Sequence, residues 1–180
     1  MILDVIKNRR SVRSFIDRPV ERRLLAACLE AARLAPSACN AQPWKFIVVD
    51  DPKVKEKLNE AAFGGIYSMN SFCKSAGAMV AVVSERQKFI AKVGGLLRGT
   101  QFYLIDIGIA CEHFVLQAQA LGLGTCWIGW FNEKGVKEVL GIPKDKKVDV
   151  LIPVGYYDTS KPAQDKVRYP PEETSSFNKY

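Results

Sequence analysis

The segment from Phe102 to Leu121 limits the possible folds of this chain more than any other feature. Drawn as an α-helix, it carries small and large apolar residues almost all round, whereas a surface helix keeps them on one side. A helix of that kind has to be covered by other parts of the protein. We therefore expect it to be the deeply buried, central helix of a globular domain.

The 180 residues are enough to build a core around such a helix without disulfides or a structural metal. No internal repeat or domain boundary is evident, so residues 1–180 are predicted to form one domain. The longest uninterrupted apolar runs, Ala78–Val83 and Val150–Val154, are much shorter than the ~20 residues of a membrane span. Residues 1–20 are charged throughout and lack the apolar core of a signal peptide. We expect a soluble, cytoplasmic protein that does not contact membranes.

Helical and strand patterns alternate along the rest of the chain. Further helices are predicted over residues 2–8, 21–34, 51–62 and 133–140, and buried strands over residues 44–50, 78–84, 125–131 and 148–154. Such alternation predicts helices that cover a sheet, in an α/β or α+β arrangement. Residues 155–180 contain several prolines and few apolar residues, which predicts an extended arm. At ~3.3 Å per residue the arm can reach a neighbouring subunit, and a free tail is the alternative.

Cysteine and histidine usage argues against a disulfide framework and against a metal site. The five cysteines are odd in number, widely spaced and never arranged as CxxC, and His113 is the single histidine. We expect buried, reduced thiols and a structural histidine. Because His113 lies in the predicted central helix, no nucleophile and base pair of hydrolase type is expected either.

Positive charge is the main clue to a ligand. The chain has 26 Lys+Arg against 19 Asp+Glu, a formal charge of +7, and residues 1–23 are markedly basic. Three polar clusters stand out, at residues 9–13, 37–44 and 166–168. Arginines beside hydroxyl and amide donors suit a phosphate-bearing ligand. A solvated basic face or a nucleic-acid patch is the other interpretation of the same residues.

Together these clusters resemble the motifs of the flavin-dependent nitroreductase family, in the correct order along nearly the whole chain. Near the start, RRSVRSF resembles that family's R-[RH]-S-x-[RK]-x-F motif, and APSACNAQPWKFIVV resembles its P-S-x-x-N-x-Q-P-W-x-F block. Further on, DIGIACEHFVLQAQALGLGTCWIG resembles the dimer-forming helix and the strand after it, IPVGYYD the closing strand, and KVRYPPEE the K-x-R-x-P-[LP]-E-E arm.

The resemblance implies a fold and an assembly. The fold is an α+β, three-layer sandwich with a central mixed sheet flanked by helices. The assembly is an intertwined homodimer in which the C-terminal arm, residues 155–180, is exchanged between subunits. FMN would be bound at the two subunit interfaces, so that each site uses both chains.

The basic clusters are the first site residues that the resemblance implies. By motif position, Arg9 and Arg10 contact the FMN phosphate or ribityl chain, and Lys166 and Arg168 of the arm complete the cationic site. Ser11 donates a hydrogen bond.

Other site residues are implied around the flavin ring. Arg13 occupies the position of a cation near flavin N1 and O2, where it would tune the flavin by stabilising its reduced form. From the partner chain, the expected flavin-lining residues are Pro36, Ser37, Ala38, Asn40 and Gln42. The stretch of Trp127, Ile128 and Gly129 corresponds to the segment whose backbone amides donate to flavin N5 and O4. Asn70 is either a flavin contact or a turn residue.

Some aromatic residues are expected in the protein core and others beside the substrate. Trp44 and Trp127 are expected in the core or in strands. Residues that could border the substrate are Phe63, Tyr67 and Phe72, with Phe89, Phe102 and Tyr103 as alternatives. Substrate choice is expected in residues 85–100.

The implied activity is that of an FMN-dependent NAD(P)H oxidoreductase. Hydride would pass from NAD(P)H through flavin N5 to a nitroaromatic, a quinone or a similar small acceptor by a ping-pong mechanism, without a catalytic acid or base from the protein. One alternative is a specialised flavoprotein of the same family, of the dehalogenase, dehydrogenase or flavin-destructase type. The other is a basic polyanion-binding protein, whose affinity would fall steeply with salt.

Overall fold

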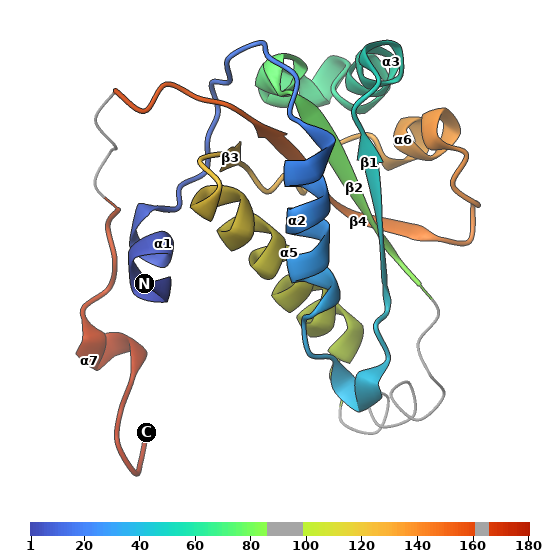
Figure 1. Cartoon of the computed structure of the whole chain (residues 1–180). Coiled ribbons are helices and arrows are strands. Elements are labelled where there is room, and N and C mark those ends of the chain that lie inside the picture. The colour runs from blue at the N-terminus through green and yellow to red at the C-terminus, as the bar shows by residue number, and fades with distance from the viewer. Residues whose placement is uncertain (86–98, 161–165) are drawn as a thin grey trace.

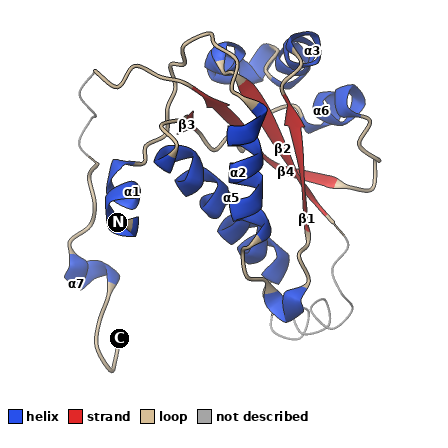
Figure 2. Cartoon of the chain, in the orientation of Figure 1, coloured by secondary structure: helices blue, strands red, loops and turns tan. Residues whose placement is uncertain are grey.

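The computed structural model describes residues 1–85, 99–160 and 166–180, and its described part is built in three layers. Helices α2 (Arg22–Arg33) and α5 (Phe102–Ala120) cover one face of a central sheet. Helices α3 (Pro52–Ala62) and α6 (Glu133–Leu140) cover the other face (Figures 1 and 2). The α+β sandwich expected from the sequence is confirmed.

The described sheet has four strands in the order β1-β2-β4-β3. They are β1 (Trp44–Val49), β2 (Ala78–Ser84), β4 (Lys147–Gly155) and the short β3 (Gly124–Thr125). Every pairing among these strands is antiparallel. Among the described residues, the parallel component of the sheet is a single bridge, in which Ser11 lies beside Thr125.

Strand β2 shows why the sheet sits between two helical layers. Successive side chains of a strand point to opposite faces. In β2, Val80 and Val82 pack in the cluster formed with α2 and α5, whereas Met79, Ala81 and Val83 pack in the cluster formed with α3 and α6. A strand buried on both faces is therefore apolar throughout, as the run at 78–84 predicts.

Capping residues fix where the outer helices begin and end. The Asp51 carboxylate accepts hydrogen bonds from the backbone N–H groups of Lys53 and Val54 at 2.9 and 3.0 Å, at the start of α3. The Asn132 side chain accepts from Gly135 N–H at the start of α6. Gly141 ends α6 in the left-handed region, with φ 63°, where glycine carries no steric penalty.

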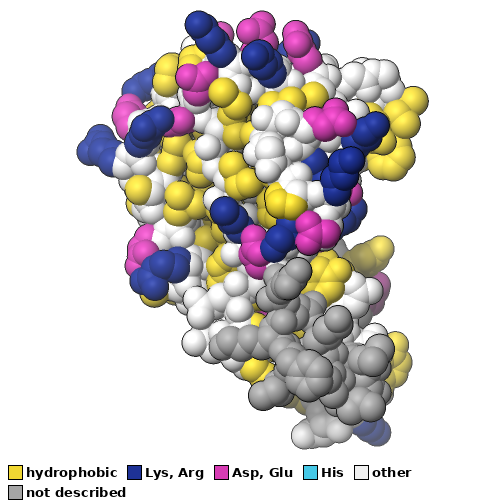
Figure 3. Space-filling view, turned by 90° about the vertical axis from the view of Figure 1, so that its right-hand side faces the viewer, with side chains coloured by type: hydrophobic (Ala, Val, Ile, Leu, Met, Phe, Trp, Pro, Cys, Tyr) yellow, Lys and Arg dark blue, Asp and Glu magenta, His cyan; other side chains and the backbone are white. Residues whose placement is uncertain are grey.

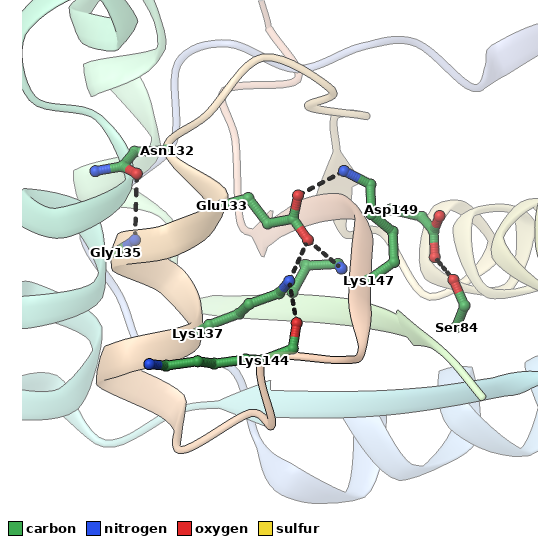
Figure 4. Close-up of polar contacts among 9 residues, drawn as sticks. Ser84, Asn132, Glu133, Gly135, Lys137, Lys144, Lys147 and Asp149 are labelled. Carbon is green, nitrogen blue, oxygen red and sulfur yellow. Dashed lines mark hydrogen bonds and ion pairs between the residues drawn. The ribbon is translucent and has the colours of Figure 1, made fainter. Parts of the chain in front are cut away.

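A polar cluster ties α6 to β4 (Figure 4). Glu133 pairs with Lys137 at 2.8 Å and with Lys147 at 2.5 Å, and it accepts a hydrogen bond from Val148 N–H. Burial alone would raise the pKa of Glu133, but the hydrogen bonds from these groups outweigh it and lower the pKa to about 2. Nearby on β4, Asp149 accepts a hydrogen bond from Ser84 of β2, while its burial raises its pKa.

Helix α5 is only partly covered. Its inner face buries residues that include Ile107, Cys111 and Phe114. On its outer side Leu104 is 44% exposed and Ile105 is 52% exposed. The expectation of a helix buried on all sides is thus correct for the inner face and wrong for the outer face of a single chain.

Other expectations need correction. The strand predicted over residues 125–131 pairs continuously only at Gly124–Thr125 and again at the isolated bridge of Ile128 with Leu151. Trp127, expected in the core or in a strand, is 39% exposed and lies outside the strands. The five cysteines form no disulfide with one another, and four are buried as expected, but Cys39 is exposed. His113 has a structural contact, because its Nδ1 lies 3.2 Å from the carbonyl oxygen of Ala31.

Part of the C-terminal arm lies beside the start of the chain, where Lys166 contacts Lys7. Helix α1 (Ile2–Asn8) packs near α5, and the arm, which includes the short helix α7 (Pro171–Thr174), runs past α1 (Figure 1). The arm residues Val167, Tyr169 and Phe177 are highly exposed. The extended form of the whole arm, residues 155–180, and its exchange between subunits stay predictions.

The surface shows how the net charge is distributed. On the face in Figure 3, basic and acidic side chains are interspersed among apolar ones, without a continuous basic field. In the described part of the chain, no helix is both long enough and apolar enough to cross a membrane.

Candidate functional site

The segment after α1 lies against the end of α5. Val12 N–H donates to the carbonyl oxygen of Thr125 at 2.8 Å, so that residues 11–13 run beside β3. Gly124 makes this approach possible, because a Cβ there would lie 2.6 Å from Val12 Cγ2 and 2.7 Å from Tyr157 Cδ1. Three segments far apart in sequence therefore meet at one place.

A group of cations surrounds that place. Lys166 of the arm donates from Nζ to the carbonyl oxygens of Lys7, at 3.0 Å, and of Arg9. Burial and the neighbouring charges of Arg9, Arg168 and Arg10 lower the pKa of Lys166. The structure thus brings together the four residues expected at the FMN phosphate, which we name the cation cluster: Arg9, Arg10, Lys166 and Arg168.

Arg10 gives the cation cluster a hydrogen-bond donor that is available to a ligand. Its Nε is buried and has no hydrogen-bond partner among the described residues. Its guanidinium carbon lies 6.0 Å from the centre of the Tyr157 ring. A buried donor without a partner costs about 1–3 kcal/mol, so an anion that accepts from it would recover that free energy.

One acid lies beside the cation cluster. Glu112 of α5 is 3.8 Å from Arg9 Nε and is partly buried. Burial raises the pKa of Glu112, although Arg9 and Lys166 oppose the shift. Among the described residues, Glu112 is the one carboxylate whose charge acts on Lys166, against three arginines, and this excess of cations favours an anionic ligand.

Ser11 and Arg13 lie at the same corner, next to Cys126. Burial raises the pKa of the Cys126 thiol, and three neighbours oppose the rise: the charge of Arg13, a hydrogen bond with Ser11 and the charge of Arg9. Both the Ser11 and the Arg13 side chains are exposed to solvent. They are therefore free to face a ligand beside β3.

The loop after α2 is held in an unusual conformation. Cys39, Asn40 and Gln42 have φ values of 53°, 49° and 47°, in the left-handed region that non-glycine residues seldom adopt. The Ser37 hydroxyl accepts from Gln42 N–H at 3.0 Å, and Gln42 Nε2 donates to Asn40 Oδ1 at 3.0 Å. We name residues 36–42, which include η1 (Ala38–Asn40), the 36–42 loop.

A buried carboxylate anchors this loop. Asp106 of α5 is 4% exposed, and its Oδ1 accepts a hydrogen bond from Ala38 N–H at 2.9 Å. Asp106 is not among the site residues expected from the sequence. The sequence signal for its role is that it is the one acid in an otherwise apolar turn of the central helix. A buried carboxylate of this kind requires a hydrogen-bond partner inside the protein.

The two parts of the expected flavin site lie at opposite ends of α5. The 36–42 loop is bonded to Asp106 near the start of the helix, whereas Ser11 and Val12 lie beside Thr125, just after its end. At 1.5 Å per residue, the fourteen positions from Asp106 to Ala120 alone span about 20 Å. One chain therefore does not bring all the expected site residues into one pocket.

Residues 127–130 pass close to the cation cluster end of the molecule. Ile128 N–H donates to the carbonyl oxygen of Leu151 at 2.9 Å, and its side chain is buried in the core. This leaves Trp127 and Gly129 as the exposed members of the expected flavin stretch. A Cβ on Gly129 would meet nothing within 4 Å, so space is open at that point.

The expected substrate-bordering residues separate into two groups. Phe63 is buried in the core and Phe72 is partly buried against it, so neither is presented on the surface. Tyr67 instead packs against Trp130, a residue that the sequence analysis did not identify. Asn70 donates to the carbonyl oxygen of Trp130 at 2.8 Å, which gives it a structural partner. Phe89 and most of the segment 85–100 lie outside the described residues.

The described part of the chain is thus an α+β sandwich with a group of cations at one corner, where Arg10 Nε has no partner among the described residues. The model of the Nitroreductase family matches residues 6–70 and 68–156, which is most of the chain. The chain therefore belongs to the Nitroreductase family.

Three individual proteins illustrate the range of the relatives. A solved structure titled as an FMN-dependent nitroreductase from Clostridium difficile R20291 is 29% identical, with a TM-score of 0.73 and coverage of 99% of both chains. An FMN reductase [NAD(P)H] of Bacillus subtilis is 29% identical over 79% of this chain and 60% of its own length. An iodotyrosine deiodinase of Thermotoga neapolitana is 25% identical over 96% of this chain and 95% of its own length.

Proposed function

We propose that the protein is an FMN-dependent oxidoreductase that takes a hydride from NAD(P)H and delivers it to a nitroaromatic, a quinone or a similar small acceptor. The observation that carries this proposal is the cation cluster, in which the buried Nε of Arg10 has no hydrogen-bond partner among the described residues. Membership of the Nitroreductase family and the names of its FMN-dependent relatives support it.

The residues present fit FMN. Its phosphate dianion would accept from Arg10 Nε and would be attracted by Arg9, Lys166 and Arg168, which repel one another without it. Ser11 would donate from its hydroxyl. When bound, FMN supplies the redox centre that reacts first with the nicotinamide and then, after NAD(P)+ leaves, with the acceptor.

Arg13 is assigned an electrostatic role. Its guanidinium lies near Cys126 at the start of the 127–129 stretch, and its side chain is exposed. A fixed positive charge at the flavin edge would stabilise the charge that accumulates on reduction. Trp127 and Gly129 would present backbone donors, since the Ile128 N–H is already bonded to Leu151.

The site is proposed to form in a homodimer. Each chain carries the cation cluster at one end of α5 and the 36–42 loop at the other, about 20 Å apart by helical rise. A two-fold axis across α5 would bring the 36–42 loop of one subunit to the cation cluster of its partner. Two complete sites would result from two incomplete chains.

Uncovered apolar surface along α5 supports this assembly. Leu104 and Ile105 are exposed on its outer side. A groove of about 610 Å³ between α1, α2 and α5 is lined mainly by apolar residues, among them Met1, Leu34 and Leu116. Surface of this kind in a folded chain marks a contact with another protein, and a second copy supplies a matching face.

The polyanion-binding interpretation uses the same arginines in another way. Four of the cations lie close together, since the charges of Arg9, Arg10 and Arg168 all act on Lys166, instead of forming a long stripe. A compact cluster suits one phosphate group better than a nucleic-acid backbone.

The first test is a visible absorption spectrum of the purified protein, taken before and after anaerobic addition of NADH and then NADPH. We expect a flavin band that one or both nucleotides bleach, in a protein that elutes as a dimer. Protein that stays colourless when FMN is added would contradict the proposal and favour the polyanion binder. A flavin band that neither nucleotide bleaches would contradict the donor and favour a specialised flavoprotein.

A further inference from the structure

Trp130 is a large apolar side chain that is exposed to solvent and yet held in place by several contacts. The residue is 54% exposed, although its ring and backbone are held from two sides. Its Nε1 donates to the carbonyl oxygen of Ile66 at 3.3 Å, and its own carbonyl oxygen accepts from Asn70 Nδ2 at 2.8 Å. The Tyr67 ring lies 5.3 Å from it, centre to centre, at an angle of 48°.

These contacts fix the indole without covering it. All three partners come from η2 (Gly65–Ser75), a segment about sixty residues away in the chain. The indole N–H and the backbone carbonyl of Trp130 are both engaged by η2, so the part of the side chain left for a ligand is its apolar ring. Ile66 is 73% exposed and Met69 is 74% exposed beside it. We name these four residues the aromatic patch: Ile66, Tyr67, Met69 and Trp130.

The position of the aromatic patch connects it to the candidate site. Trp130 directly follows Gly129, where the structure leaves open space beside the backbone. Trp127, on the other side of Gly129, is exposed as well. A ligand that contacts the 127–129 stretch therefore has the Trp130 ring as an immediate neighbour.

We propose that Trp130 is a specificity-determining residue that selects planar aromatic acceptors by contact with its ring, and that Tyr67 and Asn70 are positioning residues that hold it. This inference rests on the proposed function, because it concerns the acceptor of that reaction. Rings contact one another favourably in offset or tilted arrangements, and a rigid indole loses little conformational freedom on binding. The sulfur of Met69 would add a contact with a ring edge.

The test compares acceptors of different shape on the flavin-loaded protein. The dissociation constant of 4-nitrobenzoate for the oxidised holoenzyme is read from the change in flavin absorbance. In turnover with saturating NAD(P)H, kcat/KM is measured for menadione, which is planar and aromatic, and for ferricyanide, which is neither. The variants are Trp130→Ala, Trp130→Phe and, as a control, Val54→Ala, which removes an exposed apolar side chain on α3.

We expect Trp130→Ala to weaken 4-nitrobenzoate binding and to lower the menadione to ferricyanide ratio of kcat/KM, each about tenfold. Trp130→Phe, which keeps an aromatic face, should stay within about threefold of the wild type. The control Val54→Ala should have the same binding and the same kcat/KM ratio as the wild type. A loss shared equally by menadione and ferricyanide, or a Phe variant as weak as the Ala variant, would overturn the proposal. So would an Ala variant that binds 4-nitrobenzoate normally.

The measurement of 4-nitrobenzoate binding distinguishes a failure of this inference from a failure of the proposed function. Binding of 4-nitrobenzoate requires the flavin-loaded protein but no reaction with NAD(P)H. A wild-type flavin that NAD(P)H does not bleach would contradict the proposed function, whereas normal turnover with an unchanged Trp130→Ala variant would contradict only the role of Trp130.

Discussion

Replacement of Asp106 by alanine tests how the 36–42 loop is held for the flavin. The change removes the acceptor of the Ala38 N–H bond, 2.9 Å long, from the start of α5. Hydrogen bonds to charged groups contribute about 1.5–3 kcal/mol. The loop also holds Cys39, Asn40 and Gln42 in left-handed conformations, which cost of order 1–3 kcal/mol each and persist only when neighbouring contacts impose them.

These magnitudes set the expected loss of affinity. Without this bond the loop has to be ordered when FMN binds, so the lost hydrogen-bond energy is subtracted from the binding free energy. With 1.4 kcal/mol for each factor of ten, Asp106→Ala is expected to weaken FMN binding by about 10- to 100-fold. The melting temperature of the apoprotein should change little, because removal of a buried carboxylate also removes its desolvation penalty.

The assay is a titration of apoprotein with FMN, followed by the quenching of flavin fluorescence. Asp106→Asn keeps an oxygen acceptor without the charge and should recover a large part of the affinity. Asp50→Asn is the control, because Asp50 is another partly buried carboxylate, bonded to Arg22 beyond the opposite end of β1 from the loop. The reasoning is refuted if Asp106→Ala binds FMN as tightly as the wild type.

Three further outcomes follow from the charged residues. Arg10→Ala should weaken FMN binding at least tenfold in the same titration and leave riboflavin binding nearly unchanged, with Arg23→Ala as control; an equal loss for both flavins would contradict the phosphate role. Arg13→Ala should weaken reduced flavin more than oxidised flavin and lower the midpoint potential, and equal affinities for both redox states would contradict its role. The pKa of Glu133 is lowered from 4.5 to about 2, so its contribution, roughly 2 kcal/mol, is present above pH 4.5 and is lost as the pH falls toward 2. Denaturant unfolding of Glu133→Gln between these pH values should therefore show a shallower pH dependence than the wild type.

Most helices and strands could be predicted from local sequence patterns. The strand at 78–84 and the helices at 52–62 and 133–140 were predicted within one residue of their observed bounds. The continuous apolar run marks the strand, and Asp51 and the glycines after the helices mark where the helices begin and end. The segment 125–131 was less predictable. Its β-branched and aromatic residues favour a strand, but the chain leaves the sheet after Thr125 and turns Trp127 outward. Tertiary contacts, which propensity does not encode, decide that turn.

The candidate site was predictable where motifs lie close together in sequence. Arg9, Arg10 and Ser11 belong to one motif, and the structure adds that Lys166 of the arm joins them. Trp130 was not predictable, because its role depends on contacts with η2 that no local pattern announces. The outer face of α5 shows a related limit, since a composition that is apolar all round states that the face is covered but not by what.

The separation of the 36–42 loop and the cation cluster along α5 has a genetic consequence. If each site combines the cluster of one subunit with the loop of the other, then Arg10→Ala and Asp106→Ala damage opposite halves. In a dimer that pairs one subunit of each variant, one site receives both defects and the other receives none. Co-expression of two alleles that are each defective would thus restore a functional site, and two copies of either allele alone would not.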